Sequence, residues 1–506
     1  MGLRECYLTG VFFIGTISGG ALTGCNLLGT CVPDGNTNTN SNVNDNVNGN
    51  SAIDLPAFPG AEGFGAVATG GRGGRVIYVT NLNADGPGSF QAALDEVGPR
   101  YILFKVSGLI DGEAHLTRGD VTIAGQTSPG GVIVRGFHTT EEPYCDTPCE
   151  PQQFAENWIL RHLRTRPGDD GMDDGLRILH TRRAIVDHCS IANATDEAVQ
   201  LSYSNDITIQ NCLLAETLGD HSQYGGMLLN YSDPPHGFEL THLSIHHNCW
   251  NRLEGRLPEL SRENDVAANT TMRLELSNNL MFDAGYFIDI GTNTGVAGGL
   301  PLHYAMNFVG NYYFVRADFP YGMASFSTGA PTAETSIFMN GNRMNLYTDR
   351  ADAALVYCCN DYPSQTPSTE TPSWSRTARH DFPEVTYVES TTLRQHMVDH
   401  VGAFPRDPMD RRLMAPVESG SITLSARNAN PAGDAFSLDF SSASPPAAPT
   451  DSDDDGMPDA WETAHGLNPS VQDHNGTGLS VGLTGVAGYT NLECYLNELA
   501  DSLEGT

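Results

Sequence analysis

Short, mostly apolar segments that close in His or Asn recur through the middle of the chain. They read NWILRHL, AIVDHCS, ITIQNCL, LSIHHNC, LELSNNL, NFVGNYY and IFMNGNR. Short apolar runs bounded by turn-forming residues are typical of buried β-strands. The polar residues of these segments follow one another at spacings of 23 to 37 residues, a period that indicates a repeat architecture. They are His162, His188, Asn211, Asn248, Asn279, Asn311 and Asn342.

Variable spacing between strands of one type predicts an all-β fold, a right-handed parallel β-helix (a solenoid), over residues 55–440. In this fold each coil stacks on the previous one, and insertions go to the loops. Asn side chains at the ladder positions are expected to hydrogen-bond along the stack. Cys189, Cys212 and Cys249 each follow one ladder residue and are expected to form one interior column of thiols. A β-propeller is the alternative, but its blades need several strands per unit at more even length.

The first 54 residues are predicted to be an export signal and a tether. Residues 1–25 contain an apolar run too short to span a membrane and end in LTGC, which resembles a bacterial lipobox. This pattern predicts a lipid on Cys25 and a cell-surface lipoprotein, with ordinary secretion as the alternative. The Asn-rich residues 26–54 have almost nothing apolar to bury and predict a flexible linker.

Charge limits the partners of the protein. The formal net charge is -34, and Lys105 is the only lysine. Such a surface repels nucleic acid and anionic lipid, so we expect a monomer that contacts a membrane only through its anchor. Export implies an oxidising compartment, in which Cys145 and Cys149 are close enough in sequence to close a small disulfide loop. Zinc is the weaker interpretation, because no second pair of ligands stands at zinc spacing.

Two acidic clusters stand one predicted coil apart. DDGMDDGLRI supplies Asp173 and Asp174, and ANATDEAVQL supplies Asp196 and Glu197. Either cluster alone would be interpreted as a solvated turn. On adjacent coils the two lie side by side, and like charges so placed require a cation. A set of oxygen ligands favours Ca²⁺.

Arginines follow the acidic clusters along the same stack of coils. The stretch LEGRLPELSR places Arg256 and Arg262 two coils beyond the second acidic cluster. A groove that combines arginines and calcium on an otherwise acidic protein suits an acidic polysaccharide, because guanidinium groups bind carboxylates in a bidentate manner.

Four segments carry a resemblance to a known family. These segments include the sequences AFPGAEGFGAVATGG, VTIAGQTSPGG, VDHCSIANATDEAV and HHNCWNRLEGRLP. In this order they resemble the pectate lyases of polysaccharide lyase family one, over residues 57 to about 345. The resemblance implies a parallel β-helix that cleaves polygalacturonate by calcium-assisted β-elimination.

The resemblance also implies a set of calcium ligands. Asp174 stands where the family keeps a calcium ligand, 13 residues before the DH of VDHC. Asp196 matches the first acid of the pair on the next coil. The second acid of that pair is replaced by Gln200, and the neighbouring Glu197 is the candidate to take its place.

The remaining site residues also follow from the resemblance. Arg256 in GRLP matches the arginine assigned as the catalytic base, and Arg262 lies one residue further along than the family's substrate-binding arginine. Leu218 stands where a substrate-binding lysine is expected. His221 and Tyr224, in GDHSQYGG, are the nearest candidates to fill that role.

The C-terminal part predicts a second calcium site. Residues 441–450 are rich in Pro and small residues and form a linker to an EF-hand-like module at 451–498. Its segment DSDDDGMPDAWE carries Gly456 at position 6 of a 12-residue loop. The acidic residues at positions 1, 3, 5, 9 and 12 are Asp451, Asp453, Asp455, Asp459 and Glu462.

Two other functions remain open. A non-catalytic β-helical carbohydrate-binding protein would be consistent with Gln200 and with the missing lysine. A glycosidase could use Asp173, Asp174 and Asp196 as acid and base on water.

Overall fold

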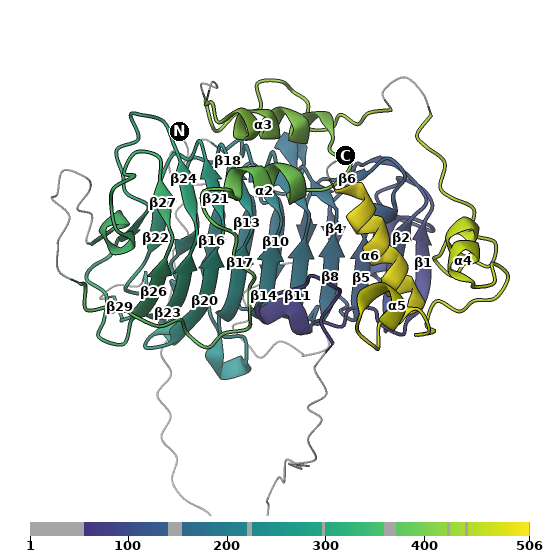
Figure 1. Cartoon of the computed structure of the whole chain (residues 1–506), viewed down its shortest axis with the longest axis horizontal. Coiled ribbons are helices and arrows are strands. Elements are labelled where there is room, and N and C mark those ends of the chain that lie inside the picture. Colours follow the sequence, from purple (N-terminus) through teal and green to yellow (C-terminus); the bar gives the residue numbers. More distant parts are fainter. Residues whose placement is uncertain are drawn as a thin grey trace, which may run out of the picture. The chain divides into compact units, whose positions relative to one another are not determined.

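Three long parallel sheets wind along one axis, each strand of one sheet leading to the next sheet (Figure 1). The computed structural model describes residues 55–139, 154–219, 225–295, 299–358, 371–422, 426–440 and 444–504. All strand pairs of these three sheets are parallel, which is the arrangement of a right-handed parallel β-helix. The fold predicted from the repeating segments is therefore confirmed.

Sheet A holds eleven of the described strands: β1 (Arg75–Val79), β2 (Arg100–Phe104), β5 (Val121–Ala124), β8 (Trp158–Arg161), β11 (Arg182–Asp187), β14 (Asn205–Gln210), β17 (Thr241–His246), β20 (Thr271–Ser277), β23 (His303–Val309), β26 (Ser336–Asn340) and β29 (Ser375–Arg376). Sheet B holds nine: β3 (Gly108–Ile110), β6 (Val132–Val134), β9 (Arg164–Thr165), β12 (Ser190–Ala192), β15 (Leu213–Ala215), β18 (Cys249–Asn251), β21 (Leu280–Phe282), β24 (Tyr312–Phe314) and β27 (Arg343–Met344). Sheet C also holds nine: β4 (Ala114–His115), β7 (Phe137–His138), β10 (Leu176–Leu179), β13 (Val199–Ser202), β16 (Met227–Leu229), β19 (Glu259–Leu260), β22 (Ile288–Ile290), β25 (Ala324–Phe326) and β28 (Val356–Cys358).

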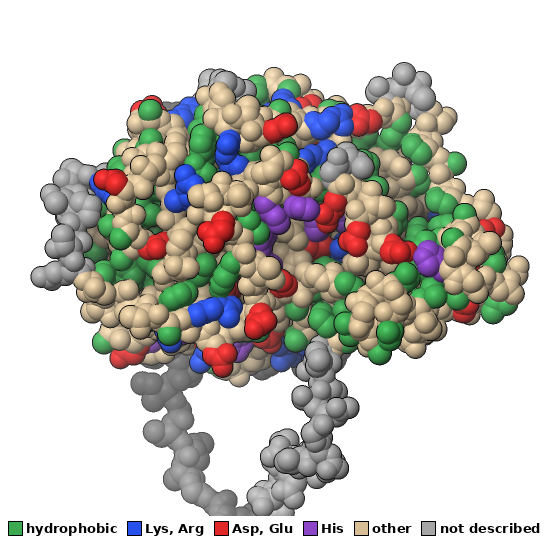
Figure 2. Space-filling model, viewed as in Figure 1, with side chains coloured by type: hydrophobic (Ala, Val, Ile, Leu, Met, Phe, Trp, Pro, Cys, Tyr) green, Lys and Arg blue, Asp and Glu red, His purple; other side chains and the backbone are tan. Residues whose placement is uncertain are grey.

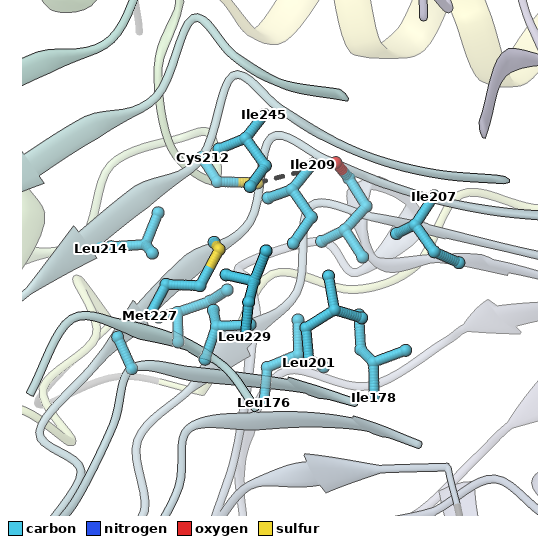
Figure 3. Close-up of a cluster of buried hydrophobic side chains, with 14 of the residues drawn as sticks. Leu176, Ile178, Leu201, Ile207, Ile209, Cys212, Leu214, Met227, Leu229 and Ile245 are labelled. Atoms are coloured by element: carbon cyan, nitrogen blue, oxygen red, sulfur yellow. Dashed lines mark hydrogen bonds between the residues drawn. The ribbon is translucent and has the colours of Figure 1, made fainter. Parts of the chain in front are cut away.

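The space between the sheets is filled by aliphatic side chains. Figure 3 shows Leu176, Leu201 and Leu229 of sheet C pointing toward Ile209 and Ile245 of sheet A. Each of these side chains is buried, and another aliphatic residue stands in register with it on the next coil. Burial of this kind contributes about 1.5 to 3 kcal/mol for each large side chain, so the stack of coils is the main source of stability.

A ladder of buried asparagines runs along the turn between sheets A and B. Asn279 donates from Nδ2 to the Ile245 carbonyl (2.8 Å), and its Oδ1 accepts from the backbone N–H of Asn248 (3.2 Å). The same pattern continues to Asn311 and Asn342. These amides satisfy backbone groups that the turn would otherwise leave buried without a partner.

The register corrects two details of the sequence interpretation. His162, His188 and Asn211 are not in the ladder but one position earlier, in the left-handed backbone region, with φ of 55°, 50° and 53°. The interior column therefore runs through Cys189 and Cys212 and continues with the asparagines. Cys249 pairs in register with Leu213 on sheet B and packs under the helices outside the sheet, so the expected single column of three thiols is wrong.

Helices cover the outside of two sheets. α2 (Leu393–His400) and α3 (Pro408–Ser419) pack on sheet B, and α6 (Asn491–Leu503), yellow in Figure 1, crosses the first strands of sheet A. The other helices are short: α1 (Phe90–Leu94), α4 (Asp459–His465), α5 (Ser480–Thr484) and the 3-10 turns η1 (Phe64–Val67), η2 (Gly125–Thr127), η4 (Gly168–Asp170), η5 (Pro234–His236), η6 (Asp265–Ala267) and η7 (Asp352–Leu355). No helix among the described residues has the length and apolar character needed to cross a membrane.

The end of α6 is held by histidines. Glu504 lies between His400 Nδ1 of α2 (2.5 Å) and His188 Nε2 of the β-helix (3.3 Å). Figure 2 shows His side chains, in purple, gathered near the centre of this face, with acidic side chains spread around them. The C-terminal segment is therefore fastened to the β-helix at its far end as well as along its helices.

The asparagine ladder predicts a large loss of stability on a small truncation. Asn279→Ala leaves the amide of Asn248 and the carbonyl of Ile245 without their partners and lowers the free energy of unfolding by about 3 kcal/mol. Denaturant unfolding measures this loss. Asn83→Ala, in an exposed loop, is the matched control and stays close to wild type. Equal stability of the two variants would contradict the structural role of the ladder.

Candidate active site

One residue of each strand of sheet C points outward, between neighbours that point into the core. Because the strands are in parallel register, these residues line up along the helix axis. All members of this row but Leu228 of β16 are polar or charged. The row consists of His115, His138, Arg177, Gln200, Leu228, Glu259, Asp289, Ser325 and Tyr357.

Three of the predicted calcium ligands lie together beside this row. Asp174 precedes β10, and Asp196 and Glu197 precede β13 on the next coil. One carboxylate oxygen from each lies within 4.8 Å of the others. The backbone N–H of Glu197 donates to Asp174 Oδ1 (3.0 Å), which fixes the two coils against each other. We call these three residues the acidic group.

The acidic group suits a hard cation. Its donors are all carboxylate oxygens, the ligand type that Ca²⁺ prefers. The pKa of Asp174 is raised to about 7. Burial is the main cause and the nearby charge of Asp173 contributes, whereas Arg177 lowers the pKa in part. Arg177 neutralises part of the negative charge of Asp173 and Asp174, because it donates from Nε to Asp174 (2.8 Å) and from Nη2 to Asp173 (2.5 Å). The negative charge that remains in the acidic group fits a divalent ion.

Arg256 reaches the acidic group from two coils away. Its Nη1 donates to Glu197, and its Nε donates to Glu259 (2.9 Å) on the outward row. The backbone that carries it is held against the previous coil by a bond from Met227 N–H to the Arg256 carbonyl (2.6 Å). Only Gly fits at 226, because a Cβ there would stand 2.0 Å from that same carbonyl oxygen.

Arg262 does not join this group. Its side chain is fully buried, and it donates to Thr270 Oγ1 (2.9 Å) and to the His303 carbonyl (2.9 Å). Its guanidinium also lies over the ring of Tyr304. The expected carboxylate clamp does not fit this position, because the buried guanidinium is occupied by Thr270 and His303.

The structure adds residues that sequence reasoning did not select. Glu259 and Asp289 follow Gln200 along the outward row, and burial with the nearby Glu259 raises the pKa of Asp289 to about 6. In the sequence, each of these two acids stands next to an apolar residue within a short strand, and this alternation could have indicated an outward-facing side chain. Gln200 itself is half-buried on the row and supplies no carboxylate. His221, Tyr224 and Cys25 lie outside the described residues, as do Cys145 and Cys149.

Known proteins resemble this chain over most of its length. Probable pectate lyase C of Aspergillus flavus is 30% identical over 467 residues, which cover 88% of this chain and 95% of that protein. Probable pectate lyase C of Aspergillus oryzae is 30% identical over 460 residues, with the same coverage. The chain belongs to the pectate lyase family. No family model matches it.

Solved structures with similarity to this member of the pectate lyase family were also found. The cedar pollen allergen jun a 1 is 13% identical with a TM-score of 0.44, over 68% of this chain and 92% of that one. A pectate lyase of Bacillus sp. N165 in complex with trigalacturonate is 14% identical with a TM-score of 0.42, over 68% of this chain and 99% of that one.

A second group of carboxylates lies in the C-terminal loop of this family member. Asp451, Asp453 and Asp455 lie within 4.8 Å of one another, and Asp455, Glu462 and Asp473 do likewise. Both carboxylate oxygens of Asp453 and of Glu462 are buried without a hydrogen-bond partner. Burial, with Asp455 and Asp453 nearby, raises the pKa of Glu462 to about 7. Unpaired buried oxygens of this kind fit a bound cation.

Two residues change the set of carboxylates expected in the C-terminal loop. Asp459 is not in either carboxylate set, because its Oδ1 and Oδ2 accept from the N–H and hydroxyl of Ser452 (both 2.7 Å). Asp473 follows the 12-residue loop in sequence and lies beside Asp455 and Glu462, so it joins the predicted residues as a further carboxylate.

The C-terminal loop packs directly on the β-helix. Met457 and Leu492 form one buried cluster with Tyr101 and Leu103 of β2. Three polar contacts join the same surfaces, those of Tyr78 with Asp451, of Lys105 with Asp454 (2.8 Å) and of Arg72 with Glu493 (2.8 Å). The loop therefore covers the first coils of the β-helix.

The raised pKa of Asp174 predicts a pH-dependent effect of its replacement. Its folded-state pKa of about 7 lies above the ordinary 3.8, so its ionisation costs stability as pH rises between these values when no cation is bound. With chelator at pH 8, Asp174→Asn therefore raises the melting temperature by about 2 °C or more, and near pH 4 it has little effect. Calcium stabilises wild type more than the variant.

The neighbouring Asp173→Asn is the control, because Asp173 also contacts Arg177 but is largely exposed. It is expected to give a smaller gain at pH 8 than Asp174→Asn, because the charge of Asp173 raises the pKa of Asp174 less than burial does. An Asp174→Asn variant that melts below wild type at pH 8 with chelator would contradict the claim that ionisation of this buried carboxylate lowers the stability of the fold.

Proposed function

We propose that this protein cleaves polygalacturonate by β-elimination, with Ca²⁺ held by Asp174, Asp196 and Glu197 and with Arg256 as the base. The observation that carries the proposal is the contact of Arg256 with Glu197. This contact brings together, on one outward face, the carboxylates that fit a cation and the arginine that the family resemblance assigns to proton transfer. The names of the relatives support the reaction and the polymer.

The chemistry requires charge neutralisation first. The proton at C5 of a uronate is weakly acidic, and its removal places negative charge on the adjacent carboxylate. Calcium bound at the acidic group supplies the positive charge that stabilises this enolate-like intermediate. The electrons of the C5–H bond then form the C4=C5 double bond as the bond from C4 to the bridging oxygen breaks. The departing oxygen takes up a proton, so that no water is added.

Each residue of the site has a distinct proposed task. Arg256 accepts the C5 proton as a neutral guanidine, since the guanidinium ion has no lone pair to take it up. Glu259 holds its Nε and so orients it. Arg177 holds Asp173 and Asp174 in place. His221 and Tyr224 contact the substrate in place of the missing lysine. Arg262, from its buried position, supports the backbone that follows β19 through Thr270 and His303.

Replacement of the base tests this function. On polygalacturonate with calcium, wild type is expected to release a product that absorbs ultraviolet light, and a chelator is expected to stop it. Arg256→Lys is expected to lower turnover by about 100-fold or more while polymer binding stays largely intact, because an ammonium cannot keep both carboxylate contacts. Arg273→Lys, at an exposed position on sheet A, is the control.

The same assay separates the other functions. A glycosidase would give reducing ends without ultraviolet absorbance, and a binding protein would give neither. Near-normal activity of Arg256→Lys would refute the role of Arg256 as the base.

We further propose that the C-terminal loop binds calcium through Asp451, Asp453, Asp455, Glu462 and Asp473. The unpaired buried oxygens of Asp453 and Glu462 support this ligand set. Asp459 is left out, because Ser452 occupies its carboxylate. Bound calcium would hold the loop in the shape that packs against β1 and β2, which makes the module a structural cap.

Two adjacent residues distinguish a calcium ligand from a surface acid. Asp453→Asn removes a proposed ligand and is expected to weaken calcium binding to the loop by about 10-fold or more. Asp454→Asn changes a residue that contacts Lys105 instead and is expected to leave calcium affinity unchanged. Calorimetric titration measures both. If the calcium holds the cap in place, its removal with chelator is also expected to make wild type more sensitive to protease near residues 441–450. Equal affinities would refute the ligand set.

We also propose export of the protein to the cell surface. The support is the N-terminal pattern alone: residues 1–25 as a signal, Cys25 as the lipidated residue and residues 26–54 as the tether. Secretion without an anchor is the alternative. Either location brings the enzyme to a polymer too large to enter a cell.

A further inference from the structure

Glu197 belongs to two groups at once. It is one of the three carboxylates that fit a cation, and it is also a partner of Arg256. A second carboxylate that contacts Arg256, that of Glu259, is not in the acidic group and binds a different nitrogen, Nε. The site therefore holds its arginine with one carboxylate that is shared with the cation position and one that is not.

The backbone around Glu197 is fixed, whereas its side chain has two alternative cationic partners. Its N–H donates to Asp174 Oδ1 (3.0 Å), and its carbonyl accepts from the Gly175 N–H (2.9 Å). The backbone of Arg256 is held equally firmly through Met227. A change of partner therefore requires only rotation of the Glu197 side chain.

A cation bound at the acidic group would compete with Arg256 for Glu197. Its side chain is 3% exposed, so water screens its charge poorly. A guanidinium and a divalent ion on one buried carboxylate repel each other, and the carboxylate stabilises each less when the other is present. Binding of either cation therefore weakens the contact of the carboxylate with the other.

We infer that Glu197 is a positioning residue that couples calcium binding to Arg256: on calcium binding it leaves Arg256 Nη1 for the ion, while Glu259 keeps Nε in place. This inference rests on the proposed function, in which the coupling matters because Arg256 Nη1 turns toward the substrate only after calcium is bound. It goes beyond that function in stating a thermodynamic link between two residues. Glu197 thus does more than replace the acid lost at Gln200.

Calcium affinity without substrate tests the link. The experiment uses calorimetric titration of the full chain with calcium chloride, for wild type, Arg256→Gln, Glu197→Gln and the double variant. Arg256→Gln is expected to tighten binding at the active-site position by about 10-fold, because Glu197 no longer has to leave a partner. In the Glu197→Gln background the same change is expected to have an effect of about 2-fold or less. The loop ligands near residue 455 are unchanged in all four proteins, so their titration step is a common reference.

Glu259→Gln is the matched control, because it removes a second partner of Arg256 without touching the acidic group. It is expected to leave calcium affinity within about 2-fold of wild type. Thermal melting checks that each variant is folded, and the uncharged Arg256→Met replaces Arg256→Gln in the cycle if the latter is not.

The outcome separates this inference from the proposed function. An equal gain in calcium affinity from Arg256→Gln in both backgrounds would overturn the link. The gain would then come only from removing the repulsion between the Arg256 charge and calcium, without Glu197. Looser binding in Arg256→Gln would overturn it too, because the two cations would then assist each other. Failure of wild type to act on polygalacturonate would refute the proposed function and leave the measured coupling valid.

Discussion

The register of the parallel strands is the constraint on which the rest of the structure depends. Each coil places its strand directly over the previous one, so residues 23 to 37 positions apart in sequence become neighbours in space. A slip of one residue would turn Arg177 or Glu259 inward and bring a leucine outward. The aliphatic core, with large burial on every coil, makes such a slip costly. The asparagine ladder adds a polar check, because its amides find partners only in the observed register.

This constraint explains why the fold and part of the site could be predicted from the sequence. Repeated apolar segments fix the strands, and once strands stack, Asp174 and Glu197 on adjacent coils must be close. The sequence could not tell which polar residue of each turn enters the ladder, because His188 and Cys189 differ by one position and only the backbone conformation decides between them. The same uncertainty of one residue misplaced Cys249. Arg262 was expected to bind substrate, but its hydrogen bonds to Thr270 and His303 hold it in a buried position that the sequence pattern does not reveal.

Acidic and basic groups at the site are arranged in a chain of shared partners. Arg177 holds two aspartates, Glu197 joins the acidic group to Arg256, and Glu259 holds the far side of the same guanidinium. The family resemblance implies an acid at the position of Gln200 and a lysine at that of Leu218. We therefore propose that the calcium site depends strongly on the shared Glu197. In the C-terminal loop, no arginine or lysine of the described residues forms an ion pair with the five proposed calcium ligands. Its cation is therefore proposed to stabilise the cap of the β-helix.

The claim that the row on sheet C performs elimination is tested most directly by the source of oxygen in the products. The reaction is run on polygalacturonate in water labelled with heavy oxygen, and the product fragments are weighed by mass spectrometry immediately after cleavage. The account predicts fragments that carry no label at the cleaved linkage beyond ordinary exchange at the reducing end, each pair summing to the mass of the parent. Fragments heavier by one labelled water would contradict it, because they would show that water, not loss of the C5 proton to Arg256, breaks the chain.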